Sequence, residues 1–414
     1  MKQDMQQIRP ENMERTVAWT ESGESVLRFN IRHLWFFGLW PLYESRMFHI
    51  YTAYGFSLGV WNVLEGALAA YFTWGDMEQT TLVLMATSTN CNGLVKMGFF
   101  LWDRRLYYSL VRRVDALMSL QSEFCCRESV LWNILRGSER HAFRLTLGML
   151  LFMFSQCFIW FPMPLVSHSE EQRLPFAQHV WDNNTGNYEL SYIAQCAAGL
   201  WMTQISFGMD CLFASVMILL AAQLEIVAER IMGIRVEAST PMKEKAEGYK
   251  KSSTAKHADT MYKDIRLCIE SHQKILSFVA HLQDTMSPIA MTQFTSAVLV
   301  ICFGLFQATY SEDFSAVLKC ASFLPIPCGQ VYLYCWAANN VTMQAEAVMM
   351  AAYSCSWVEA SGRFKRVLRI LISRAQKPLV LTAGHLYPID REAFLSLVNA
   401  SYSYYALLSQ MNNR

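Results

Sequence analysis

A row of polar side chains follows helical spacing near the end of the chain. At 100° per residue, Ser396, Asn399, Ser403, Leu407 and Gln410 fall on one side of a helix, with Ala400 among them. Facing a water-filled axis, these hydroxyl and amide groups would be satisfied by water and would let hydrated cations pass. Leu407 would then form a hydrophobic constriction, and Gln410 would offer neutral carbonyl oxygens to a cation. The alternative is polar packing between membrane helices.

The composition favours a membrane protein. The chain is 53% hydrophobic and 17% charged, against about 25% charged for an average soluble domain. A net charge of +1 gives no support for nucleic-acid binding, so no nucleic-acid partner is expected. The 12 cysteines lack metal-site spacing, and no HExxH, GxSxG or P-loop motif occurs. We therefore expect no enzyme activity, no cofactor and no metal.

Seven segments are apolar and long enough to cross a bilayer as helices. They are His49–Trp74, Thr80–Trp102, Ala142–Val166, Tyr192–Ala228, Pro288–Tyr310, Phe314–Val341 and Ala393–Met411. The fourth would be about 55 Å long, well above the ~30 Å hydrocarbon core, so it should project beyond the membrane. The sixth is broken by LPIPCG. The predicted fold is an all-α membrane protein with seven transmembrane helices.

Lys and Arg residues set the orientation. Ten of them lie between the fourth and fifth spans, whereas Arg173 alone lies between the third and fourth. Basic loops stay in the cytosol, so the N-terminus is predicted to be cytosolic and the C-terminus extracellular. This orientation is opposite to that of G-protein-coupled receptors. The base-poor third connection also carries a glycosylation sequon at Asn183, consistent with an outer loop.

Three ionisable residues fall inside the predicted spans, where they are functional candidates. Lys96 lies near the cytosolic end of its span and is expected to snorkel to the interface. Asp210 and Glu65 lie deeper and are expected to pair with polar groups between helices.

Two basic cytosolic segments are also distinctive. In SGRFKRVLRILISRAQKP, the residues Phe364, Val367, Leu368, Leu371 and Ile372 line one helix face, which would suit the anionic inner leaflet. The Lys-rich stretch KEKAEGYKKSSTAK is expected to be a solvated, mobile loop.

The last 80 or so residues contain a set of matching motifs. They are Tyr334-Cys335, Asn339, Ala352-Tyr353, Trp357, Arg374-Ala375-Gln376-Lys377-Pro378-Leu379, Thr382-Ala383-Gly384, Phe394 and Ser401-Tyr402-Ser403. This pattern resembles the C-terminal signature of insect odorant receptors. Two departures are Ala338, where the family usually has Gly, and residues 343–346, which lack the usual Glu-Ser pair. The ending Ser403-Tyr404…Gln410-Met411 is also similar to a gustatory-receptor motif.

The resemblance implies a ligand-gated, nonselective cation channel in the plasma membrane of sensory neurons. It implies a tetramer with a co-receptor subunit, and one final helix from each subunit lining a central pore. The implied partners are this co-receptor, a small volatile odorant, membrane lipid and permeating cations. The cytosolic loop at residues 231–286 lacks the co-receptor's insertion, so the chain is similar to the odour-tuned subunit. In the family alignment, Leu407 and Gln410 coincide with the gate and the narrow outer ring.

The same resemblance divides the chain into four regions. These are a cytosolic segment at 1–48, transmembrane helices 1–6 with their cytosolic loops at 49–341, a cytosolic anchor at 342–390 and the pore-lining helix at 391–414. The family builds its anchor from the third region and the projecting helix ends. The amphipathic helix at 361–378 thus has two alternatives, the anchor and the membrane surface.

The family places an odorant pocket in the outer half of the membrane, among spans 2, 3, 4 and 6. Helical spacing in those halves gives the candidates Met85, Ser88, Thr89, Ser155, Phe158, Ile159, Met202, Ile205, Ser206, Phe323 and Tyr332. Each of these residues has helix–helix packing as its alternative role. As a set they suit a small aromatic odorant. The rival functions are a gustatory channel for soluble tastants, a G-protein-coupled receptor and a secondary transporter.

Overall fold

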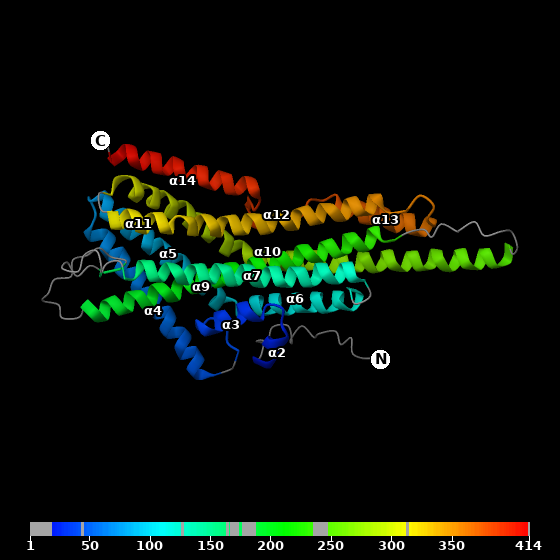
Figure 1. Ribbon diagram of the computed structural model, residues 1–414, viewed down its shortest axis with the longest axis horizontal. Coiled ribbons are helices and arrows are strands. Elements are labelled where there is room, and N and C mark those ends of the chain that lie inside the picture. Colours follow the sequence, from blue (N-terminus) through cyan, green and yellow to red (C-terminus); the bar gives the residue numbers. More distant parts are fainter. Residues whose placement is uncertain are drawn as a thin grey trace.

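The protein is an elongated bundle of helices that run along one long axis (Figure 1). The computed structural model describes residues 19–42, 45–125, 128–162, 165, 174–175, 188–234, 247–311 and 314–412. Its helices are α2 (Trp19–Glu24), α3 (Arg28–Phe36), α4 (Arg46–Phe72), α5 (Met77–Trp102), α6 (Arg104–Cys125), α7 (Ser129–Trp160), α9 (Tyr188–Met232), α10 (Glu247–Tyr310), α11 (Phe314–Phe323), α12 (Pro325–Ser354), α13 (Gly362–Ala375) and α14 (Arg391–Asn412). A short antiparallel pair, β1 (Thr382–Ala383) and β2 (Tyr387–Pro388), precedes α14.

The helical class predicted from the sequence is confirmed, and where the structure describes them the seven predicted spans are mainly helix. Three described helices, α7, α9 and the Asp259–Tyr310 part of α10, are long and apolar enough to cross a membrane by length and composition. The sixth span breaks at Leu324, between α11 and α12, as LPIPCG predicted. Pro325 begins α12, where its missing N–H removes no helical hydrogen bond.

The long helix α10 corrects the predicted loop before the fifth span. It begins at Glu247, so most of the Lys-rich stretch is helical, and it continues through Pro288. Proline removes one helical hydrogen bond, and in a membrane helix neighbouring hydroxyl groups re-satisfy the freed backbone. The carbonyl that loses its helical donor here is that of Asp284, one turn before Pro288, and α10 continues past it. The predicted fifth span is therefore the C-terminal part of a much longer helix.

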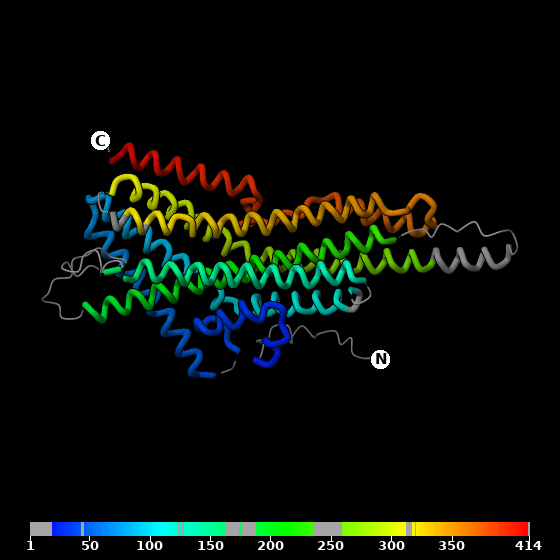
Figure 2. Tube along the Cα trace, viewed as in Figure 1, coloured from blue at the N-terminus to red at the C-terminus, as the bar shows by residue number. Residues whose placement is uncertain are grey.

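The core of the bundle is α9, which follows its long axis (Figure 2). In the apolar window of α9, 94% of the residues are buried. A helix that is hydrophobic on all sides must be surrounded by protein or lipid, and α9 packs against α3, α4, α5, α7, α10 and α12. The fourth span was predicted to be unusually long, and α9 is indeed a helix of 45 residues.

Two segments outside the seven predicted spans pack in ways that the sequence left open. Leu27, Ile31 and Trp40 of the N-terminal region are buried in the main core. On α13, Phe364 and Leu368 of the predicted apolar face are buried, and the helix packs against α12 and α10. This contact occupies the face that would have lain on the inner leaflet, so the packing supports the anchor alternative.

Candidate functional site

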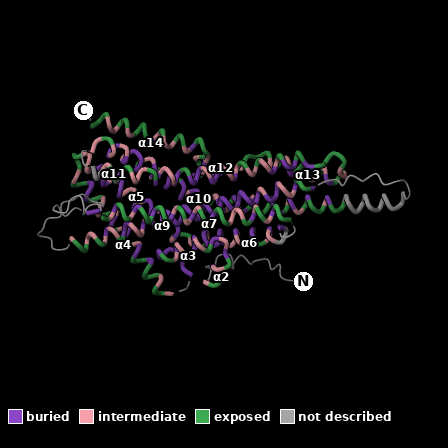
Figure 3. Tube along the Cα trace, in the orientation of Figure 1, coloured by how far each residue is buried: buried purple, intermediate pink, exposed green. Residues whose placement is uncertain are grey.

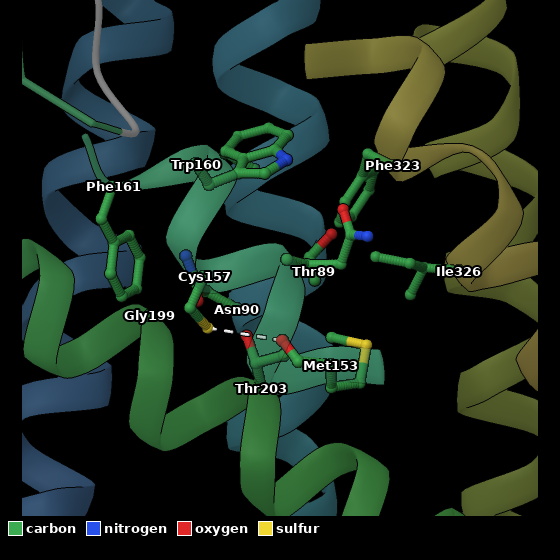
Figure 4. Close-up of a pocket in the computed structure, with 12 residues that line it drawn as sticks. Thr89, Asn90, Met153, Cys157, Trp160, Phe161, Gly199, Thr203, Phe323 and Ile326 are labelled. Atoms are coloured by element: carbon green, nitrogen blue, oxygen red, sulfur yellow. Dashed lines mark hydrogen bonds between the residues drawn. The ribbon is translucent and has the colours of Figure 1, made fainter. Parts of the chain in front are cut away.

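A small cavity lies between α5, α7, α9 and the junction of α11 with α12 (Figure 4). Its volume is about 50 Å³. The lining residues are Ala86, Thr89, Asn90, Met153, Gln156, Cys157, Trp160, Phe161, Gly199, Thr203, Phe323 and Ile326. The wall is mainly aromatic, aliphatic and sulfur-bearing with a few polar groups, which is the usual character of a small-molecule site.

Helical periodicity explains how α7 forms one wall. Met153, Gln156, Cys157 and Trp160 follow one another at three- and four-residue steps, so they share a face. The Trp160 ring packs against Phe323, with ring centroids 5.2 Å apart, and closes one end of the cavity (Figure 4). On α9 the wall is Gly199 and Thr203, whose small side chains leave room for the cavity.

One buried polar atom of a wall residue lacks a hydrogen-bond partner. Gln156 is 9% exposed, and its Oε1 accepts no hydrogen bond from the described residues. A buried acceptor without a partner costs about 1–3 kcal/mol. By contrast, the Thr89 hydroxyl already donates to the Met85 carbonyl at 3.0 Å. The cavity therefore favours a mainly apolar molecule that donates one hydrogen bond to Gln156.

The size of the cavity limits what it holds without movement. A buried water needs roughly 10–15 Å³ of space for its centre. The cavity volume of about 50 Å³ therefore accommodates about four waters. An aromatic odorant is larger, and its entry requires side chains to move. Phe161 and Phe323 are half-buried wall residues, and displacement of either ring would enlarge the cavity.

The structure brings together part of the ligand set predicted from the sequence. Thr89 and Phe323 lie on the cavity wall, and Met85 packs in the same cluster as Trp160. Ser88 instead lines a separate groove beside α10. The α9 residues Met202 and Ile205 are fully buried in the main core, and Ser206 belongs to a polar cluster.

On the third predicted span, the face with the candidate ligand residues points away from this cavity. Ser155, Phe158 and Ile159 do not line the cavity, and Phe158 is 77% exposed. Lipid-facing and ligand-facing positions of an apolar helix are equally hydrophobic, so spacing alone did not fix its rotation. Gln156 was the available signal, because an amide in an apolar span usually faces protein.

Tyr332 of the sixth span also lies away from the cavity. It is 53% exposed, and its ring packs edge-on against Phe394 near the start of α14, 5.6 Å between centroids. The cavity residue that sequence reasoning missed on this span is Ile326.

The expectation that Lys96 snorkels to the interface was wrong. Its side chain is 0% exposed, and its ammonium donates to Asp210 at 2.6 Å, to Gln293 at 2.6 Å and to Ser206 at 3.0 Å. Asp210 also accepts from Gln330 and Tyr334. The charge-assisted hydrogen bond to Asp210 inside the bundle is more favourable for the Lys96 ammonium than hydration at the membrane surface.

The two acidic residues behave as predicted. Asp210 pairs between helices with Lys96, as described. Glu65 of α4 accepts a hydrogen bond of 2.8 Å from the Gln195 amide of α9.

The predicted polar row of α14 lies on the side of that helix that faces away from α10. Ser396, Asn399, Ser403, Leu407 and Gln410 are all exposed, on a helix that Figure 3 shows exposed over much of its length. The opposite side holds α14 to α10. There the Tyr405 hydroxyl donates to Thr309 at 3.3 Å, and the hydroxyls of Ser409 and Tyr310 are hydrogen-bonded to each other.

Two further expectations concern sites other than the cavity. Asn183, the predicted glycosylation site, lies outside the described residues. Within the described ranges, no group of three or more His, Cys, Asp or Glu side chains forms a metal-binding cluster.

Comparison with known proteins places these features in a family. The model of the 7tm Odorant receptor family matches residues 76–402. The chain is 25% identical over 366 residues to odorant receptor Or2 of Anopheles gambiae, covering 86% of this chain and 90% of that protein. It is 26% identical over 346 residues to odorant receptor 10 of Aedes albopictus, covering 82% and 87%.

Two other similarities concern the co-receptor and the fold. The chain is 24% identical over 148 residues to the odorant receptor coreceptor of Anopheles gambiae, covering 36% of this chain and 31% of that protein. The structure resembles that of the insect olfactory receptor OR5 from Machilis hrabei in complex with eugenol. The TM-score is 0.77 at 17% identity, covering 93% of this chain and 97% of that one.

Proposed function

The chain belongs to the 7tm odorant receptor family, and from that membership we propose that this odorant receptor is the odour-tuned subunit of a cation channel. In this proposal a small volatile molecule binds in the cavity beside Trp160, and the channel opens. Seven membrane-spanning helices place the N-terminus in the cytosol and the C-terminus outside, as the charge distribution favours. The site of action is the plasma membrane of sensory neurons.

The observation that carries the channel proposal is the outward polar row on α14. Ser403 and Gln410 are exposed, while Tyr405 and Ser409 bind the subunit's own α10. The Ser403 hydroxyl already donates to the Asn399 carbonyl at 2.9 Å, but the side-chain amides of Asn399 and Gln410 would be unsatisfied in hydrocarbon, whereas a water-filled axis satisfies them. In a tetramer, four α14 helices would supply that axis. Because the row carries no charge, selectivity among small cations would be low.

A continuous set of contacts joins the cavity to α14. Ile326 on the cavity wall lies one helical turn before Gln330. Gln330 accepts from the Gln293 amide of α10 at 3.0 Å. The next residue, Phe294, packs edge-on against Tyr387 in the segment that leads into α14, 6.3 Å between centroids.

Through these contacts, a ligand that binds the open arrangement more tightly would shift the population toward it. Opening would carry Leu407 away from the axis.

The proposed assembly is a heterotetramer with a co-receptor subunit. The similarity to the Anopheles gambiae coreceptor supports this partner. Four cytosolic projections, from α9, α10, α12 and α13, would form the anchor in which subunits meet. The permeating cations and surrounding lipid complete the set of proposed partners.

The test is whole-cell current in cells that express the chain with and without an insect co-receptor, with G-protein signalling blocked. We expect a fast cation current to volatile odorants only when both subunits are present. Leu407→Ala should raise the current without odorant. Leu408→Ala is the matched control, because Leu408 is half-buried and lies off the exposed row.

Three outcomes would contradict parts of the proposal. Current from the chain alone would remove the need for a co-receptor. Good surface expression without current to any volatile would remove the odorant-gated channel, and tastants and G-protein readouts would be tested next. Equal effects of the two leucine variants would remove Leu407 from the gate.

A further inference from the structure

A second recess lies on the other side of α5 from the odorant cavity. It is an open groove of about 670 Å³ between α4, α5, α10 and the turn at Gly384. No residue is shared between its lining and that of the cavity. Its walls combine hydroxyl groups, such as those of Ser88 and Ser296, with apolar side chains, such as Val95 and Leu299. The groove therefore has the amphipathic lining of a binding site rather than a purely lipid-like surface.

The orientation of one lining residue, Asn92, is fixed by the buried charge beside it. The Lys96 ammonium donates to Gln293 Oε1, so Gln293 must present its oxygen on that side. That same oxygen accepts from the Asn92 amide nitrogen at 2.8 Å. The nitrogen of Asn92 is thus directed inward, and the positive charge of Lys96 prevents either amide from being flipped.

This arrangement leaves the Asn92 carbonyl oxygen as an acceptor without a donor. Asn92 lines the groove and is only 6% exposed, and its Oδ1 has no hydrogen-bond partner among the described residues. Two other hydroxyls of the wall, those of Thr292 and Thr295, already donate to carbonyls one turn earlier on α10. The groove therefore has one strong unmet requirement, for a hydrogen-bond donor at Asn92.

We propose that this groove is a second ligand site, which binds a small amphipathic alcohol or phenol from the membrane. Asn92 Oδ1 lies beneath the groove wall, so a small movement of the wall lets the hydroxyl of the ligand donate to it, while the apolar body lies against Val95 and Leu299. This site is distinct from the odorant cavity, and binding to it does not depend on the channel proposal.

A ligand in the groove would also contact the support of α14. Met291, Thr295 and Leu299 of α10 line this groove and also the adjoining groove between α10 and α14. On the α14 side, that second groove is lined by Leu397, Ala400 and Tyr404. A ligand in the new site therefore changes how α14 packs against α10. Because this site is separate from the odorant cavity, the ligand would act as a modulator and not as the odorant.

Photolabelling tests the proposal without any need for channel activity. The full-length chain with its co-receptor, in lipid nanodiscs, is irradiated with a 4-alkylphenol that carries a diazirine, and labelled peptides are mapped by mass spectrometry. We expect labelling within residues 87–99 and 288–299. The methyl ether of the same probe cannot donate a hydrogen bond and should label these peptides at least about tenfold less, which corresponds to about 1.4 kcal/mol.

Two matched variants separate the groove from the cavity. Ser88→Phe fills the groove and should abolish labelling of residues 288–299, whereas Thr203→Phe fills the cavity and should leave it intact. Labelling confined to cavity peptides would overturn the proposal. Equal labelling by the phenol and the ether would also overturn it, and this comparison needs no variant and so does not depend on variant folding.

Discussion

Lys96 and Asp210 form an ion pair that is entirely enclosed by protein. Their Nζ and Oδ1 atoms are 2.6 Å apart, and the two side chains are 0% and 1% exposed. Hydrogen bonds to Gln293, Gln330 and Tyr334 extend the pair, so that α5, α9, α10 and α12 meet at one point. Burial of two charges is costly unless each is fully hydrogen-bonded. The cluster therefore fixes how these four helices cross, between the cavity and the base of α14.

Removal of one partner of this pair should destabilise the protein strongly. Asp210→Asn leaves an uncompensated ammonium in the interior, and loss of one partner of a buried pair costs about 3–5 kcal/mol. We expect a lower Tm of the purified protein and less protein at the cell surface. The matched control is Glu270→Gln, which breaks the exposed pair with Arg266 and should cost less than about 1 kcal/mol. An Asp210→Asn protein that melts like wild type would contradict the structural role of the pair.

Gly93 should tolerate no side chain where α5 crosses α9. A Cβ at this position would lie 2.5 Å from the Met202 carbonyl oxygen, which belongs to backbone that cannot turn away. Gly93→Ala should therefore separate the helices at a cost of about 1–3 kcal/mol. Gly98 lies on the same helix with nothing within 4 Å of its Cβ position. Gly98→Ala should be neutral or stabilising by up to about 1 kcal/mol through helix propensity, and thermal melts of the two variants make the comparison.

Gln156→Met should discriminate odorants by whether they donate a hydrogen bond. Methionine preserves the approximate volume and removes the unpaired acceptor. For a phenolic odorant we expect at least about a tenfold higher half-maximal concentration, which is about 1.4 kcal/mol. The methyl ether of that odorant should respond as before or better. Ser155→Ala, on the exposed side of the same helix, is the control. Equal losses for phenol and ether would show that Gln156 does not bind the ligand hydroxyl.

Gln410→Glu should change the ionic selectivity of the channel. A carboxylate at the outer end of the polar row would attract divalent cations more strongly than the neutral amide does. We expect the reversal potential to show a higher permeability of calcium relative to sodium. Glu392→Gln changes a charge in the first turn of α14, at its other end, and serves as the control. No shift in reversal potential for Gln410→Glu would place this residue outside the permeation path.

Acidification should destabilise the contact between the N-terminal segment and α9 through His33, which precedes the first predicted span. Burial lowers the pKa of His33 from 6.5 to about 4, although its hydrogen bond to the Gln204 carbonyl opposes the shift. The unfolded chain therefore binds more protons between these values, so stability is complete above pH 6.5 and declines as the pH falls toward 4. Near pH 5.5 the expected loss is about 1.4 kcal/mol.

The measurement for this prediction is the Tm of the purified protein as a function of pH. His33→Gln should flatten the pH dependence, because the amide can donate to the same carbonyl and does not titrate. The control is His49→Gln, which replaces an exposed histidine. If the His33→Gln protein keeps the full pH dependence, other groups cause it.

Periodicity and composition were enough to predict the helical fold, and motif resemblance was enough to predict the family. The predicted spans coincide with helices because each crossing needs a long apolar segment, which leaves a local record in the sequence. The polar row on α14 could be recognised from the sequence, since its amide and hydroxyl groups differ from the apolar residues around them, and its role as a pore lining stays a prediction. The apolar face of α13 was predictable for the same reason, because its charged residues mark the opposite side.

Only the tertiary structure decided the rotation of the apolar helices and the pairing of distant polar groups. Phe158 and Trp160 are alike in sequence, yet one is exposed and the other closes the cavity, because lipid and protein offer similarly apolar surroundings. Lys96 and Asp210 are separated by more than a hundred residues, and no local pattern records their contact. That pairing depends on how α5 and α9 cross, where Gly93 lets the two backbones meet.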